Sequence, residues 1–245
     1  MVETNAENRW VSRRAPVRKL IENAGADIIA LQEDSDEQRR DLEEAFRHSH
    51  VFHGDPAFYE ADVSYNGIFV RKSIEVSVHG AFWIVEAGKE SKPEGSNCFR
   101  HANYVRIRLA EGWLTAVNVH LDDDGSEEFK LGEMKIFVER LRALCGEFNR
   151  IVVLGDFNAI PDQPSQKYFA RAGFLDAARL RKNNETTFTG WHDGPHQERL
   201  DYIWLSKDLK SALKNYRVIG PPKRQKDGVA VYPSDHAAVL AELRF

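Results

Sequence analysis

Residues 151–158 read Ile151-Val152-Val153-Leu154-Gly155-Asp156-Phe157-Asn158. Four consecutive large apolar residues predict a strand buried on both faces, as in a sheet that is covered by helices. The polar residues that follow put Asp156 and Asn158 at the end of that strand. Because side chains alternate along an extended chain, we expect these two side chains to point the same way.

The same succession of apolar and polar residues recurs at four other places. These are the runs that end in Gln32-Glu33 and in Asn118-Val119-His120, and the runs that adjoin Asp201 and Ser234-Asp235-His236. Strand ends and their loops are where α/β proteins collect ligand-binding and catalytic groups. Each set alone has an ordinary explanation, such as a solvated strand end or a helix cap. Their repetition in order predicts one shared site.

Sequence periodicity also predicts the architecture. Helices are expected over 11–24, 36–47, 126–146 and 164–172. Strands are expected over 27–32, 65–71, 74–79, 103–109, 113–119, 151–155, 200–205, 213–219 and 237–244, and a polar loop over 220–228. No linker or repeat divides the chain, so we expect a single domain over 1–245. The predicted fold class is α/β, with two packed mixed β-sheets flanked by helices in a four-layer α/β sandwich.

Composition excludes several classes of protein. The chain has 245 residues, a net charge of −4 and 42% hydrophobic residues, which is unlike collagen, coiled coils or disordered proteins. Two cysteines, Cys98 and Cys145, are too few for a disulfide scaffold or a four-thiolate zinc site. No run approaches the ~20 apolar residues of a membrane helix, and the N-terminus lacks the apolar core of a secretion signal. We therefore expect no membrane span and a cytoplasmic location.

The polar residues themselves indicate a class of chemistry. Acids and amides without a cysteine cluster suit a hard cation such as Mg²⁺, which polarises phosphoryl oxygens. Histidines donate to phosphate oxygens or shuttle protons near neutral pH. The chain has neither the Gly-x-Ser-x-Gly of serine hydrolases nor the His-Glu-x-x-His of zinc hydrolases. The favoured reaction is metal-assisted hydrolysis of a phosphate ester.

Five ordered motifs resemble those of the endonuclease/exonuclease/phosphatase family, which has the deoxyribonuclease-I-like fold. They are Leu31-Gln32-Glu33, Asn118-Val119-His120-Leu121, Gly155-Asp156-Phe157-Asn158, Leu200-Asp201-Tyr202-Ile203 and Ser234-Asp235-His236, and they span nearly the whole chain. The resemblance implies an enzyme that uses Mg²⁺ or Mn²⁺ to hydrolyse a phosphate ester, either of a small molecule or of nucleic acid. We expect it to be a monomer.

The resemblance also implies roles for the metal-binding and water-activating residues. Glu33 would ligate the catalytic Mg²⁺ or Mn²⁺. Asp235 would lie in the metal shell or support a second metal position. Asp156 would orient or deprotonate the attacking water.

Four further residues would act on the phosphate. By resemblance, Asn158 and His120 would bind the scissile phosphate. His236 would contact the phosphate or transfer a proton, with Asp201 hydrogen-bonded to its ring. This pairing predicts that His236 keeps its proton to a higher pH than a free histidine does.

The start of the chain departs from the family pattern. Family members open with a buried strand whose Asn supports the metal site, followed by a polar loop like Glu7-Asn8-Arg9-Trp10. Only residues 1–6 precede that loop, so we expect the first strand to be missing, and neither Asn5 nor Asn8 follows an apolar run. Losing a central strand leaves neighbouring backbone groups unpaired. We expect either a start upstream of residue 1 or another way of filling the gap.

Two alternative functions remain open. A nuclease acting on DNA or RNA would use basic residues and an aromatic ring that stacks on bases. The candidates are Arg9, Arg13, Arg14, Arg18 and Lys19, then Arg71, Lys72, Arg100 and Trp191, then Lys223, Arg224 and Lys226. The early group is better explained as a solvated helix face, and Asp122-Asp123-Asp124 would repel a polyanion, which favours a small phosphoester. The other alternative, a non-catalytic binding module of the same fold, rests on the missing Asn.

Overall fold

A six-stranded sheet forms the centre of the computed structural model. The structure describes residues 9–55, 65–86, 99–123, 125–191, 198–220, 224–226 and 229–245. The strand order of the sheet is β4-β5-β6-β7-β9-β8. The strands are β4 (Val76–Trp83), β5 (His101–Leu109), β6 (Gly112–His120), β7 (Ile151–Asp156), β8 (Phe174–Asp176) and β9 (Asp201–Ser206). The sheet is mixed, because β6 and β7 run parallel whereas the other neighbours run antiparallel.

Smaller groups of strands form a second layer against this sheet. They are β1 (Ile28–Ala30), β3 (Ile68–Arg71) and β2 (His50–His53) in that order, and the pair β10 (Leu213–Ile219) with β13 (Ala238–Leu243). The two layers bury a common apolar core that includes Ile68, Val105, Val152, Ile203 and Tyr216. Burying each of these side chains contributes roughly 1.5–3 kcal/mol before the entropy cost, so this core is what holds the layers together. A hairpin of β11 (Arg224–Lys226) and β12 (Val229–Val231) forms a separate two-stranded sheet beside α1.

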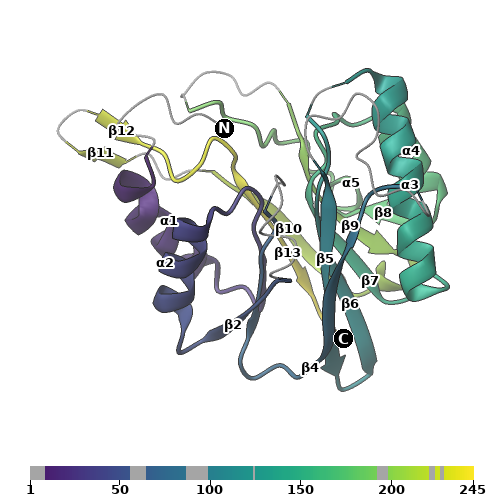
Figure 1. The fold of residues 1–245 in the computed structure, drawn as a ribbon, viewed down its shortest axis with the longest axis horizontal. Helices are drawn as coiled ribbons and strands as arrows, with labels where there is room; N and C mark the ends of the chain where they lie inside the picture. Colours follow the sequence, from purple (N-terminus) through teal and green to yellow (C-terminus); the bar gives the residue numbers. More distant parts are fainter. Residues whose placement is uncertain are drawn as a thin grey trace.

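Helices cover the outer faces of both layers (Figure 1). The helices α1 (Trp10–Ala24) and α2 (Asp36–Phe46) pack on the β1–β3–β2 side, whereas α3 (Glu127–Cys145) and α4 (Pro164–Arg171) pack on the six-stranded sheet. The short α5 (Ala177–Leu180) and the 3-10 helix η3 (Lys207–Leu209) lie near β9. The predicted four-layer α/β sandwich is therefore confirmed. No helix in the described ranges is long and apolar enough to cross a bilayer.

Several predicted boundaries differ from the structure. The expected polar loop over 220–228 is wrong in part, because it contains the strand β11, whose backbone pairs with β12. The strands β2 and β8 went unpredicted, since three or four residues are too few to show a period. β4 runs on to Trp83, beyond the predicted end at 79, because its whole length pairs with β5. Pairing across the sheet decides these elements, and a single sequence does not display it.

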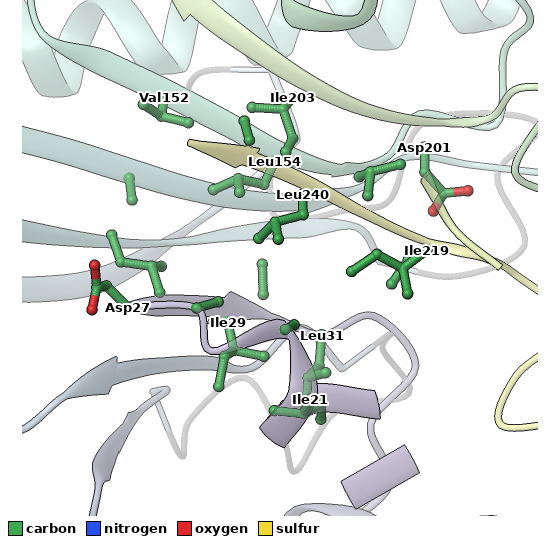
Figure 2. Close-up of a pocket in the computed structure, with 18 of the residues that line it drawn as sticks. Ile21, Asp27, Ile29, Leu31, Val152, Leu154, Asp201, Ile203, Ile219 and Leu240 are labelled. Carbon is green, nitrogen blue, oxygen red and sulfur yellow. The ribbon is translucent and has the colours of Figure 1, made fainter. Parts of the chain in front are cut away.

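A cavity of about 630 Å³ separates β1 from β13 (Figure 2). Ile29 and Leu31 line one side of it, Leu240 another, and Leu154 and Ile203 the face of the six-stranded sheet. In the described part of the chain, β1 pairs with β3 and β13 pairs with β10, and no strand lies between β1 and β13. The expected absence of a first strand stays a prediction, because residues 1–8 lie outside the described part of the chain. Asn5 and Asn8 lie outside the described residues, as does Cys98.

Candidate active site

Strand register brings three of the predicted site residues into one row. His120 lies opposite Asp156 in the parallel pair β6–β7, and Asp156 lies opposite Asp201 in the antiparallel pair β7–β9. His120 and Asp156 each end a strand and Asp201 begins one, so all three lie at the same edge of the six-stranded sheet. This is the edge that the sequence predicted as the shared site.

The backbone around Asp156 adopts conformations that favour a functional explanation. Gly155 has φ of +147°, and a Cβ there would lie 1.8 Å from the carbonyl oxygen of Val119, so only glycine fits. Asn158 has φ of +45°, and its backbone N–H donates to Oδ1 of Asp156 at 2.8 Å. Glu33 also has a positive φ, of +57°. Left-handed backbone at residues other than glycine is costly and clusters at functional sites.

His120, Asn158 and His236 converge on Asp156. The Nε2 atom of His120 lies 3.8 Å from Oδ2 of Asp156, and Nε2 of His236 lies 3.9 Å from the same oxygen. Nδ2 of Asn158 lies 3.1 Å from Nε2 of His120 and donates to the carbonyl oxygen of Leu121 at 2.9 Å. One carboxylate oxygen therefore lies between two imidazole nitrogens, with an amide beside it.

Asp201 holds the ring of His236. Nδ1 of His236 lies 2.9 Å from Oδ2 of Asp201, and the backbone N–H of Asp201 donates to Oγ1 of Thr187. Burial lowers the pKa of His236, but the hydrogen bond and charge of Asp201 outweigh it and raise the pKa to about 10. The ring then carries protons on both nitrogens at neutral pH, with Nε2–H directed to the side of Asp156. This agrees with the pairing expected from the sequence.

Burial changes the protonation of Asp156 as well. Removal from water, followed by the charge of Asp201, raises the pKa of Asp156 to about 8, although His236 lowers it. Glu33 adds to this rise through its own negative charge. A carboxylate in such surroundings is a base whose pKa lies close to neutral pH.

The two predicted metal ligands lie around this centre rather than in it. Glu33 is exposed and its backbone N–H donates to the carbonyl oxygen of Tyr65 at 2.8 Å. Asp235 is buried, and its backbone oxygen accepts from Thr189. Within the described residues, the group of acids and histidines close enough to share one ion is Asp156, Asp201 and His236, whose ligand atoms lie within 4.8 Å of one another.

Asn118 is a structural link that sequence reasoning left without a role. Its Nδ2 donates to the carbonyl oxygens of Leu31 and Gly67, and its Oδ1 accepts from Nε2 of Gln32 at 2.6 Å. Asn118 lies on β6, whereas Leu31 and Gly67 flank β1 and β3. The amide therefore ties the layer that carries Glu33 to the sheet that carries Asp156.

Arg100 is a second residue whose place was not predicted. The sequence indicated no role for it at the site beyond that of a scattered basic residue, yet its side chain is 6% exposed and pairs with Asp122 and Asp123. The charges of Asp122 and Asp123 are thus partly neutralised by the buried guanidinium of Arg100. This weakens the repulsion of a polyanion that was expected from the run Asp122-Asp123-Asp124. The register of the β5–β6 hairpin could have indicated this contact, because Ala102 pairs with Val119 and so brings Arg100 close to His120.

The early basic residues have mixed partners. Arg14 and Arg18 on α1 pair with Asp41 on α2, which agrees with their interpretation as part of a helix face. Arg13 instead lies over the rings of Trp10 and Trp191 and donates to the carbonyl oxygen of Pro233 at 3.0 Å. In the late group, Lys223 and the side chains of Arg224 and Lys226 lie outside the described residues.

Comparison with known proteins places this geometry in a family. The model of the "Endonuclease/Exonuclease/phosphatase family" matches residues 3–236. Nocturnin of Xenopus laevis is 29% identical over 135 residues, which are 49% of this chain and 34% of that protein. The match therefore spans about a third of the curated relative.

Solved structures share the fold. A mannosyl-6-phosphatase of Bacteroides thetaiotaomicron aligns with a TM-score of 0.82 and 22% identity, over 97% of this chain and 92% of that chain. TDP2 of D. rerio, complexed with single-strand DNA product, aligns with a TM-score of 0.70 and 16% identity, over 98% and 96%. At these identities the likeness concerns the fold alone.

Proposed function

Because the chain belongs to the endonuclease/exonuclease/phosphatase family, we propose that it is a phosphoric ester hydrolase that depends on Mg²⁺ or Mn²⁺. The observation that carries this proposal is the row of His120, Asp156 and Asp201 on neighbouring strands, with His236 beside Asp156. The row combines a buried base with N–H donors for phosphate oxygens, which hydrolysis of a phosphate ester needs.

The donor set fits a hard divalent cation. Carboxylate oxygens dominate it, and burial, followed by the negative charge of Asp201, raises the pKa of Asp156, as a carboxylate without a nearby metal cation shows. The ring of His236 suits a hard cation less well than a carboxylate does, and Asp201 already occupies its Nδ1. By the resemblance of Leu31-Gln32-Glu33 and Ser234-Asp235-His236 to the family motifs, we assign the cation to Glu33, with support from Asp235. When bound, it would polarise a phosphoryl oxygen and stabilise the leaving oxyanion.

Asp156 is the residue that we assign to the attacking water. Its Oδ1 is held by the backbone N–H of Asn158 at 2.8 Å, so its Oδ2 remains beside the two histidines. Burial raises its pKa to about 8, which suits a general base that works near neutral pH. Asp156 would accept the proton of the water as the new bond to phosphorus forms.

His236 would donate a proton to the leaving-group oxygen or a hydrogen bond to the phosphate. Its raised pKa keeps Nε2 protonated at neutral pH, and Asp201 fixes the orientation of the ring. His120 and Asn158 lie on the opposite side of Asp156 Oδ2 and present nitrogen atoms 3.1 Å apart. These two residues would bind the non-bridging oxygens of the scissile phosphate.

A nuclease is the second candidate, favoured by one feature of the rim. The guanidinium of Arg13 lies over the rings of Trp10 and Trp191, and it donates to the carbonyl oxygen of Pro233, which is two residues before Asp235. A cation and a partly accessible tryptophan, Trp191, next to a phosphate site suit a nucleotide strand. Cleavage of labelled single- and double-stranded DNA and RNA would distinguish a nuclease, and its binding should weaken steeply with salt.

The first experiment is a panel of phosphate esters. Purified protein is incubated with bis-p-nitrophenyl phosphate or p-nitrophenyl phosphate in Mg²⁺ or Mn²⁺, and nitrophenolate release is followed. Turnover that is lost in Asp156→Asn and kept in Asp162→Asn, whose side chain is 66% exposed, would support the proposal. Turnover that survives in Asp156→Asn would contradict the assignment of the base. A chain that binds Mg²⁺ weakly and turns over no ester would favour the non-catalytic module.

A further inference from the structure

Arg100 contacts His120 on the side of the ring away from Asp156. Its Nη1 lies 3.3 Å from Nδ1 of His120, and its Nη2 donates to Oδ1 of Asp123 at 2.9 Å and lies 3.8 Å from Oδ1 of Asp122. The side chain of Arg100 is 6% exposed, so it acts on a substrate only through its neighbours. The two acids hold the guanidinium against the imidazole.

A guanidinium determines the tautomer of a histidine that it touches. All its nitrogens are donors and it stays protonated in proteins, so the atom that faces it must accept. Nδ1 of His120 therefore bears the lone pair, and the single proton of the neutral ring resides on Nε2. The ring stays neutral because burial, and then the charge of Arg100, lower the pKa of His120 well below its ordinary value.

Asn158 competes for the opposite tautomer. Its Nδ2 lies 3.1 Å from Nε2 of His120 and would suit a bare Nε2. Turning the amide round gains nothing, because its oxygen would then face the carbonyl oxygen of Leu121, to which Nδ2 now donates. The tautomer with the proton on Nε2, which accepts from the guanidinium, is favoured, because a hydrogen bond from an ionised donor is roughly twice as strong as one between neutral groups.

The outcome is a pair of donors that face each other. Nε2–H of His120 and the amide of Asn158 lie 3.1 Å apart beside Asp156, and two N–H groups at that spacing can both reach one oxygen anion. We propose that Arg100 is a positioning residue that holds His120 as the Nε2–H tautomer, so that His120 and Asn158 together donate to one phosphate oxygen. This inference rests on the proposed function for its consequence in turnover, but the tautomer itself is independent of it.

The direct test is the ring of His120 in solution. Protein with ¹⁵N-labelled histidine is observed in Mg²⁺ buffer by two-bond ¹H–¹⁵N correlation, and the His120 signals are assigned by their loss in His120→Gln. The wild-type protein should show a protonated Nε2 and a bare Nδ1. Arg100→Met should shift the ring toward the Nδ1–H form that Asn158 favours. Arg100→Lys should retain the wild-type pattern, and so should Arg106→Gln, which removes an exposed arginine of β5.

The same variants then report on turnover of bis-p-nitrophenyl phosphate. Arg100→Met should lower kcat by about 100-fold with a smaller change in KM, as loss of one donor to a transition-state oxyanion does. Arg100→Lys should restore part of kcat, and Arg106→Gln should match the wild type. A merely structural role for Arg100 would lower stability without changing the tautomer of the folded protein.

Three outcomes decide between the explanations. A wild-type His120 that carries its proton on Nδ1, or on both nitrogens, would overturn the inference even if Arg100→Met does not fold. An unchanged tautomer in a folded Arg100→Met would also overturn it. Absence of turnover in a wild-type protein with the Nε2–H tautomer would refute the proposed function and leave the placement of Arg100 supported.

Discussion

Replacing Glu133 by glutamine should change how the stability of the protein depends on pH. Glu133 is buried in α3, and its two carboxylate oxygens accept from the backbone N–H of Asp122 at 3.3 and 3.0 Å. Burial raises the pKa of Glu133 to about 7, against the lowering effect of that hydrogen bond and of Arg100. The folded protein therefore keeps a proton on Glu133 at pH values where the unfolded chain has lost it.

The sign and size of the effect follow from this difference. Between the ordinary pKa of 4.5 and about 7, the folded state binds more protons than the unfolded state. The free energy of unfolding therefore falls as pH rises through this window, by at most ~1.36 kcal/mol per pH unit, or about 3 kcal/mol across it. Glutamine keeps an acceptor for Asp122 but does not titrate. The stability of Glu133→Gln relative to the wild type should thus rise by up to about 3 kcal/mol from pH 4.5 to 7 and then stay level.

Urea unfolding followed by tryptophan fluorescence measures this difference. Curves are recorded for both proteins at several pH values between 4.5 and 8, and free energies are compared at equal m-values. Glu139→Gln, an exposed position on the same helix, is the matched control and should show no trend with pH. A difference between Glu133→Gln and wild type that stays constant across this range would refute the reasoning.

Three further predictions concern the site. Gly155→Ala should destabilise the fold by about 3 kcal/mol or more in urea unfolding, because its Cβ would meet a carbonyl oxygen at 1.8 Å. The control, Gly132→Ala, has open space around it and should stabilise the fold slightly. Equal effects of the two substitutions on stability would contradict the strain argument. Asp201→Asn should lower kcat by about 10²–10⁴-fold and move the alkaline fall in activity to lower pH, because His236 loses the partner that raises its pKa to about 10. An unchanged pH profile would dismiss that pairing. Glu33→Gln should weaken Mg²⁺ binding in calorimetric titration, and unaltered affinity would remove Glu33 from the metal site.

The parts of the site that could be predicted from sequence are those that a strand end fixes locally. Asp156 and Asn158 follow within four residues of a run of four apolar residues, so the strand, its burial and the position of the two polar side chains are visible in one short segment. His120 lies at a strand end in the same way, and the register of β6 with β7 then aligns it with Asp156. The periodicity of the expected strands and helices was enough to predict the sandwich.

The remaining parts depend on contacts between segments. The contact between Arg100 and His120 needs the β5–β6 hairpin register, which a sequence suggests only once the turn is located. The bond that Asn118 makes to Gly67 joins two different layers, and nothing local to either residue indicates it. Short strands such as β2 and β11 form because a partner strand pairs with them. Tertiary pairing overrides local preference at each of these places.

The central claim is that Asp156 drives metal-dependent hydrolysis of a phosphate ester. The most direct test is release of nitrophenolate from bis-p-nitrophenyl phosphate, measured with Mg²⁺ or Mn²⁺, with a chelator, and with Asp156→Asn in the presence of metal. The account predicts turnover that the chelator abolishes, that returned metal restores, and that Asp156→Asn lowers by at least about 100-fold. Turnover that is indifferent to the chelator, or equal in Asp156→Asn and the wild type, would contradict it.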